Sequence, residues 1–138
     1  MRELIKRLHF VVKGRGRDAK TVVLLAAYTE QCERLDRTVA ALAPECPLLN
    51  IEVHTVDSFQ GREADIAIYS ITRSNEENRL GFLGDERRLN VALSRAKELL
   101  VLVGDHTFCR IAKGENPLKP VLEHMERQRD DCAIVDAA

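Results

Sequence analysis

Apolar residues along this chain recur with two different spacings, and segments of the two kinds alternate. Between Arg2 and Lys13 the apolar residues fall on one side of a helical period, as in an amphipathic helix with one face toward a core. Residues 21–27 form instead an uninterrupted apolar run with several β-branched side chains. Such a run is typical of a strand that is covered on both faces of a parallel sheet.

The two patterns continue through the rest of the chain. A second helix is expected to begin at Thr29, as its N-cap, and to end at the proline-containing stretch 44–47. A third is expected from about Asp85 to Ala96, because its apolar residues recur at helical spacing. Further strands are expected at 51–56, 66–72 and 98–103, and further short helices at 105–112 and 120–129. The tail, 130–138, is weakly specified.

Strands that alternate with helices predict an α/β fold with a mainly parallel sheet and helices on both faces. A chain of 138 residues fits one domain with one core. In sheets of this kind ligands bind at the carboxyl ends of the strands. Two dense polar patches, one after the expected strand 51–56 and one after 66–72, are expected to lie there.

Composition narrows the class of protein. Hydrophobic residues make up 45% and charged residues 31% of the chain, which excludes a disordered polypeptide. The net charge is −1, so the domain as a whole is not a general attractor of nucleic acid. The segment 2–20 is basic, which is consistent with a solvated helix face or with a phosphate neighbour. Without a signal peptide or a long apolar run, a cytoplasmic protein with no membrane contact is expected.

The cysteines and histidines have no metal-ligand spacing. Four cysteines are scattered without a CxxC pair, and the four histidines supply no matching pattern. We expect free, buried or half-buried thiols in a reducing compartment, and no metal site.

Candidate chemistry begins with the turn Gln60-Gly61-Arg62-Glu63. A glycine lets backbone approach a ligand closely, while an amide, a guanidinium and a carboxylate around it suit a sugar that carries phosphate. The alternative is a glycine that only relieves the backbone of a turn.

A second patch, residues 87–97, places arginines on the expected third helix. Arg88 and Arg95 are seven positions apart, so two turns of a helix would bring them to one face. An arginine that reaches a transferring phosphoryl group is one interpretation. A solvated helix face or a salt bridge to a carboxylate is the other, and the residues alone leave both open.

Taken in order, four segments carry a family resemblance: residues 21–31 (TVVLLAAYTEQ), 53–75 (VHTVDSFQGREADIAIYSITRSN), 81–97 (GFLGDERRLNVALSRAK), and a strand closing in VGD at 103–105. The set resembles the second RecA-like motor domain of superfamily 1B helicases, and among them the nonsense-decay helicase group. The resemblance runs from about Leu4 to about His106. It implies a RecA-like fold of the P-loop NTPase type.

The resemblance also implies roles for single residues. Arg95 would be the arginine finger that contacts the γ-phosphate of ATP, and Arg88 a positioning residue near it. The nucleotide would also meet residues of two motifs: Tyr28, Gln31, Gln60, Gly61 and Glu63. The nucleic-acid backbone would meet Thr55, Arg73 and Asn75. The implied ligands and partners are ATP with Mg²⁺, single-stranded DNA or RNA, and an N-terminal RecA-like domain of the same protein.

The sequence departs from the family in two ways. The basic residue that usually follows Gln31 is Cys32 here, and Arg34 is a conceivable substitute. No G-x-x-x-x-G-K-[ST] occurs in the sequence, so the chain is expected to supply one wall of an ATP site and to be inactive alone. A regulatory module that has lost catalysis is the alternative, and a stand-alone nucleotide-binding protein is a third. At 4% aromatic residues, no stacking surface is expected, and DNA is not distinguished from RNA.

Overall fold

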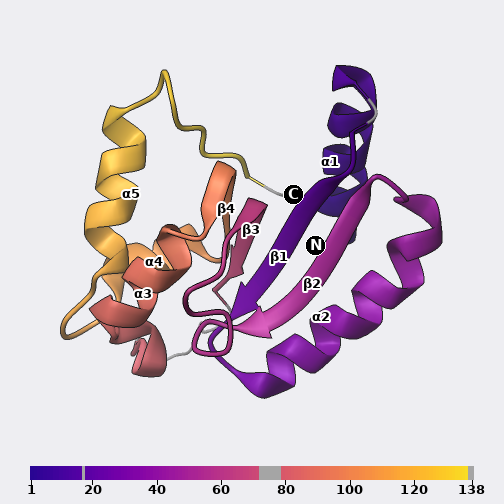
Figure 1. Cartoon of the computed structure of the whole chain (residues 1–138). Coiled ribbons are helices and arrows are strands. Elements are labelled where there is room, and N and C mark those ends of the chain that lie inside the picture. Colours follow the sequence, from indigo (N-terminus) through magenta and orange to yellow (C-terminus); the bar gives the residue numbers. More distant parts are fainter. Residues whose placement is uncertain (17, 72–78, 137–138) are drawn as a thin grey trace.

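The core of the chain is a four-stranded parallel sheet (Figure 1). The computed structural model describes residues 1–16, 18–71 and 79–136. Its strands are β1 (Lys20–Ala26), β2 (Leu49–Thr55), β3 (Ala64–Ser70) and β4 (Ala96–Val103), in the order β2-β1-β3-β4. The predicted α/β class with a parallel sheet is confirmed.

Helices cover both faces of this sheet, as predicted. Figure 1 shows α1 (Arg2–Arg15) and α2 (Thr29–Leu42) on one side, with α3 (Glu86–Leu93), α4 (His106–Ile111) and α5 (Leu118–Arg127) on the other. Successive side chains of a strand point to opposite faces, so each inner strand serves two cores. Leu24 packs in the core with Ile5 of α1, while Leu25 packs in the core with Leu89 of α3.

The two inner strands are the most apolar because both of their faces are covered. From Val22 to Ala26 every residue of β1 is buried, and β3 is nearly as enclosed. The edge strand β2 instead alternates, with Asn50 and Glu52 exposed. The uninterrupted apolar run that predicted a doubly covered strand is therefore found at the centre of the sheet.

The third helix is shorter than predicted. Helix α3 ends at Leu93, and Ala96, expected on its apolar face, is the first residue of β4. Three hydrogen bonds form where the helix ends. The Ser94 hydroxyl donates to the carbonyl oxygens of Asn90 (2.8 Å) and Val91 (3.2 Å), and the Arg95 carbonyl accepts from the N–H of Ala64 (3.0 Å). Sheet pairing therefore begins at Arg95, whereas the helical spacing predicts a helix that continues to Ala96.

Other boundaries shift by a few residues. The N-cap of α2 is Tyr28, which has extended backbone (φ −123°, ψ 140°), rather than Thr29, which is the first helical residue. A 3₁₀ turn, η1 (Ala43–Glu45), follows α2 at the predicted proline stretch. A second one, η2 (Gly81–Gly84), precedes α3 and was not predicted.

The thiols are placed as expected. Cys32, Cys46 and Cys109 are buried and Cys132 is half-buried. Burial raises the pKa of the Cys109 thiol to about 11, so it is not a reactive thiolate near neutral pH. Within the described ranges no group of three or more His, Cys, Asp or Glu side chains is arranged to hold a metal ion, and no helix is long and apolar enough to cross a membrane.

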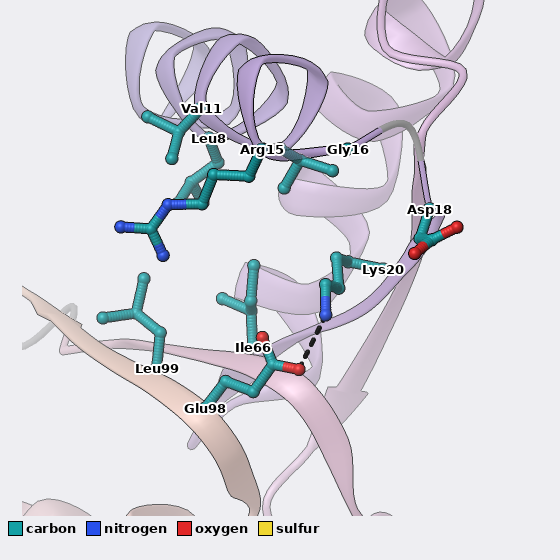
Figure 2. Close-up of a pocket in the computed structure, with 10 residues that line it drawn as sticks. Leu8, Val11, Arg15, Gly16, Asp18, Lys20, Ile66, Glu98 and Leu99 are labelled. Carbon is teal, nitrogen blue, oxygen red and sulfur yellow. Dashed lines mark hydrogen bonds and ion pairs between the residues drawn. The ribbon is translucent and has the colours of Figure 1, made fainter.

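A groove lies between α1 and the start of β4 (Figure 2). Its lining is mixed: apolar side chains, such as Leu8 and Val11 of the helix and Leu99 of the strand, lie beside charged ones. The Lys20 ammonium meets the Glu98 carboxylate at 2.7 Å across it. None of the residues that the sequence predicts for a nucleotide or nucleic-acid site lines this groove.

Gly104 packs against the end of β3 and leaves no room for a side chain. A Cβ atom there would lie 2.9 Å from Cβ and 3.1 Å from the carbonyl oxygen of Ile71. We expect Gly104→Ala to lower the free energy of unfolding by about 1–3 kcal/mol, measured by urea denaturation. Gly14 in α1 has open space around it, so Gly14→Ala is the matched control and should raise stability by about 0.5–1 kcal/mol. A neutral Gly104→Ala would contradict the packing.

Tyr69 on β3 is the second test of the core. Burial raises its pKa to about 12, from 10.0 for an ordinary tyrosine. The stability that this shift contributes is complete below pH 10 and is lost as the pH rises from about 10 to 12, because the unfolded chain releases the proton first. Over that interval we expect the unfolding free energy to fall less steeply for Tyr69→Phe than for the wild type, by up to about 1.4 kcal/mol per pH unit. Equal slopes would argue against a buried phenol.

Candidate functional site

The loop from β2 to β3 passes over the face of the sheet that carries α3. Its apolar side chains, Val56 and Phe59, are buried in the same core as Leu89 of that helix. Thr55, the last residue of β2, fixes the start of the loop. Its hydroxyl accepts a hydrogen bond from the N–H of Ser58 (3.2 Å) and donates to the Ser58 hydroxyl (3.0 Å). The Thr55 hydroxyl therefore shapes the turn, whatever else it contacts.

The Gln60–Glu63 turn that follows is exposed and defined by its backbone. Gly61 has φ 81°, in the left-handed region where L-residues with a Cβ are strained. A Cβ at Gly61 would meet no atom within 4 Å, so the requirement is conformational and not one of space. The side chains of Gln60, Arg62 and Glu63 are all exposed around it.

Arg62 is fastened to the edge strand β2. Its guanidinium meets the Glu52 carboxylate (2.7 Å) and the His54 ring (3.3 Å), and it lies 4.7 Å from the centre of the Phe59 ring. Hydrogen bonds from His54 and then from Arg62 lower the pKa of Glu52. Arg62 thereby holds the turn in place and has its charge balanced by a carboxylate.

Arg95 lies directly beside this turn. One guanidinium nitrogen donates to the carbonyl oxygen of Arg62 (3.0 Å), a second to that of Val91 (2.9 Å) and the third to the Ser94 hydroxyl (2.9 Å). All three acceptors are neutral. Across the described part of the chain no carboxylate forms an ion pair with Arg95, so its positive charge is not compensated by a close anion.

Arg88, near the start of α3, has the opposite environment. Its Nε lies 3.1 Å from an Asp57 carboxylate oxygen, and Nη1 lies 3.9 Å from Asp85. The hydrogen bond to Asp57 is the main reason that the pKa of Arg88 is raised. Asp85 also caps α3 by accepting the N–H groups of Arg87 and Arg88. Of the two interpretations that the sequence leaves open, the salt bridge to a carboxylate describes Arg88.

Tyr28 and Gln31 flank the carboxyl end of the inner strands. The Tyr28 ring meets the Phe82 ring edge-on, with centroids 5.8 Å apart, and Arg88 lies 4.7 Å from the centre of the same Phe82 ring. The Gln31 amide donates to the hydroxyl of Ser70, at the end of β3 (3.5 Å). These contacts bring Tyr28 and Arg88 together through a residue that the sequence did not single out.

The residue that departs from the family pattern, Cys32, is buried on α2. Arg34, the conceivable substitute for the missing basic residue, forms an exposed i,i+4 ion pair with Glu30 at 2.8 Å. Such pairs are weak, so this contact leaves Arg34 able to exchange partners.

The predicted site residues thus fall into two groups at the two ends of α3. Glu63 immediately precedes β3 and Arg95 immediately precedes β4, so this group lies at the amino ends of those strands, whereas the patch that contains Glu63 was expected at the carboxyl ends. The group at the carboxyl ends contains Tyr28, Gln31, Thr55 and Arg88. Arg88 and Arg95 do not share a helical face, because α3 ends before Arg95. Arg73 and Asn75 lie outside the described residues.

Sequence reasoning missed Asp57 and Phe82 as members of the second group. Asp57 is part of the quoted VDSFQG stretch, and its position just past a strand end was an available signal. Phe82 has no comparable signal, because an apolar residue before a helix is ordinarily assigned to the core.

Together these residues provide, within the described part of the chain, a guanidinium without an ion-pair partner, an exposed glycine turn and the exposed carboxylate of Glu63. Hydrogen bonds from a guanidinium to a phosphate, in which both groups are charged, are stronger than those that Arg95 makes here to neutral acceptors. The arrangement is therefore suited to bind a phosphate group beside a polyhydroxyl group, such as a nucleotide.

A family model described as an AAA domain matches residues 2–107. Regulator of nonsense transcripts 1 homolog of Drosophila melanogaster is 60% identical over 55 residues, which is 40% of this chain and 5% of that protein. ATP-dependent helicase NAM7 of Saccharomyces cerevisiae is 54% identical over 57 residues, 41% of this chain and 6% of that protein.

A DNA polymerase alpha-associated DNA helicase A of Saccharomyces cerevisiae is 44% identical over 85 residues, 62% of this chain and 12% of that protein. The matched part is thus a small fraction of each relative, between 5 and 12% of its length. The match over residues 2–107, together with the parallel sheet, assigns the chain to the AAA domain family. Within that family it is the second RecA-like domain of a superfamily 1 helicase, in the group that is similar to the nonsense-decay helicases.

Proposed function

We propose that this chain is the second motor domain of an ATP-dependent helicase or translocase that acts on single-stranded DNA or RNA. In this proposal a RecA-like domain of the same protein binds the phosphates of ATP and Mg²⁺ through a phosphate-binding loop, which the present sequence lacks. Residues 1–138 form one domain that supplies the opposite wall of the cleft. Arg95 reaches across it to the γ-phosphate, and Glu63 faces the ribose.

The observation that carries the proposal is the unequal environment of the arginines. Arg62 and Arg88 each meet a carboxylate, whereas the acceptors that Arg95 meets among the described residues are all neutral. A finger arginine must be positioned before the reaction and must still have its charge available when negative charge develops on the phosphoryl oxygens. Three hydrogen bonds to neutral acceptors give Arg95 that position without neutralising its positive charge.

The same contacts suggest how closure of the cleft is transmitted to the nucleic-acid contacts. Arg95 bonds the carbonyl oxygen of Arg62, and Arg62 is bonded to Glu52 and His54 on β2, the strand that ends at Thr55. A movement of Arg95 toward phosphate would pull on this turn and strand. We infer that Thr55, with Arg73 and Asn75, contacts the nucleic-acid backbone and shifts along it as the cleft closes.

The finger assignment predicts a specific loss. In the full-length protein, Arg95→Ala should lower nucleic-acid-stimulated ATP turnover by roughly 10²-fold or more, because transition-state charge loses its stabilising guanidinium. Arg87→Ala is the matched control, since Arg87 is an exposed arginine on α3, the helix that precedes Arg95. Circular dichroism of both variants checks the fold.

Near-normal ATP turnover of Arg95→Ala would contradict the assignment of Arg95 as the arginine finger. A wild-type protein with no turnover on any DNA or RNA tested would favour the alternative, a helicase-like binding or regulatory module, for which Cys32 in place of a basic residue is the motivation.

The one-wall arrangement makes a separate prediction. Residues 1–138 alone should show no ATP binding at micromolar concentrations in titration calorimetry and no hydrolysis, because most phosphate contacts belong to the other domain. Micromolar affinity would instead support a stand-alone nucleotide-binding protein.

A further inference from the structure

The turn before α3 exposes one aromatic ring between two buried side chains. Leu80 and Leu83 are each 3% exposed, while Phe82 is 56% exposed. The 3₁₀ turn η2 fixes the backbone between them, with the Leu83 N–H bonded to the Leu80 carbonyl oxygen (3.2 Å). The leucines anchor the turn in the core, and the turn directs Phe82 outward.

The exposed ring is itself held in one orientation. Tyr28 meets it edge-on, at an interplanar angle of 69°, and the Arg88 guanidinium lies over it, 4.7 Å from the centroid. Arg88 is fixed in turn by Asp57 (3.1 Å). A ring positioned in advance loses little conformational freedom when a ligand packs on it. Phe82 therefore differs from an isolated surface hydrophobic residue, which needs no explanation.

The remaining aromatic residues show that this is a local arrangement. Phe59, Tyr69 and Phe108 are buried in the core. Phe10, on α1, is the most exposed aromatic residue at 77%, but among the described residues its ring contacts neither another ring nor a cation. The low aromatic content predicts no stacking surface, yet the fold brings Tyr28, Phe82 and Arg88 together.

The chemistry around Phe82 favours a flat, uncharged, polarisable partner. The positive charge of Arg88 is already balanced by Asp57 and Asp85, so a bare anion gains little here. An aromatic face beside hydrogen-bonding groups is instead what nucleobases stack on, and the stacking tolerates any base because each has a π face. The Gln31 amide and the Thr55 hydroxyl lie at the same edge of the sheet.

We propose that Phe82 is a stacking platform for a nucleobase, with Tyr28 and Arg88 as the residues that position its ring. The proposal rests on the proposed function and adds to it a site for the base, where the residues discussed above would contact phosphate and sugar. The base can come from the single strand or from ATP, and the experiment separates these sources.

The test uses the full-length protein with three probes: a single-stranded thymidine oligonucleotide, an abasic oligonucleotide of equal length, and ADP. We expect Phe82→Ala to weaken binding of one base-bearing probe by roughly 5- to 100-fold, the range for loss of one stacked base, and to leave the abasic oligonucleotide unchanged. Phe82→Trp should retain affinity, and Phe82→Leu, which keeps apolar bulk without a π face, should behave like alanine. Phe10→Ala is the matched control for loss of an exposed phenylalanine.

Each outcome decides a point. Loss for the oligonucleotide assigns the platform to the strand, and loss for ADP assigns it to the nucleotide. Unchanged affinity of Phe82→Ala and Phe82→Leu for both base-bearing probes overturns the proposal, as does an equal loss for the abasic probe. If the wild type binds none of the probes, the proposed function fails together with the platform. If the wild type hydrolyses ATP with the expected dependence on Arg95, unaffected Phe82 variants refute the platform alone.

Discussion

The pairing of β3 with β4 at their amino ends sets where Arg95 meets the Gln60–Glu63 turn. The Ala64 N–H donates to the carbonyl oxygen of Arg95 (3.0 Å), and Ala64 and Ala96 are partners in the sheet. This pairing draws the chain out of the helix and brings the start of β4 next to the turn that ends at Glu63. The guanidinium of Arg95 then reaches the Arg62 carbonyl oxygen. One backbone hydrogen bond thus joins two motifs that are more than thirty residues apart in the sequence.

Two arginines of one short segment consequently have different electrostatic surroundings. Arg88 is near the helix start, where the capping carboxylate of Asp85 and the loop carboxylate of Asp57 meet it. Arg95 is beyond the helix end, where the nearby acceptors are carbonyl oxygens and a hydroxyl. The two carboxylates beside Arg88 offset its charge, whereas the neutral acceptors of Arg95 leave its charge available to an anion. The division of roles follows from position along the segment and not from residue type.

The sequence predicted the sheet well because its inner strands have a signal of their own. The run 21–27 is too apolar and too short for a surface helix, and it became the central strand β1. The end of α3 was not predictable from periodicity, because Ala96 satisfies the helical spacing and also fits a strand. The outward orientation of Phe82 was equally unpredictable from the sequence, since it depends on the burial of Leu80 and Leu83 in the core. The motif residues near Gly61 were found by their order along the chain, and that order carries no information on which end of a strand they occupy.

Two glycines of the chain restrict variation in opposite ways. At Gly61 the backbone is left-handed but the surrounding space is open, so the limit is handedness. Asparagine adopts that backbone more readily than other residues with a Cβ, and it would place an amide in the centre of the turn. At Gly104 the limit is volume, and no side chain of any kind fits against Ile71. The turn can therefore accept a different side chain at Gly61, while the carboxyl end of the sheet, where Gly104 meets Ile71, must keep its atoms where they are.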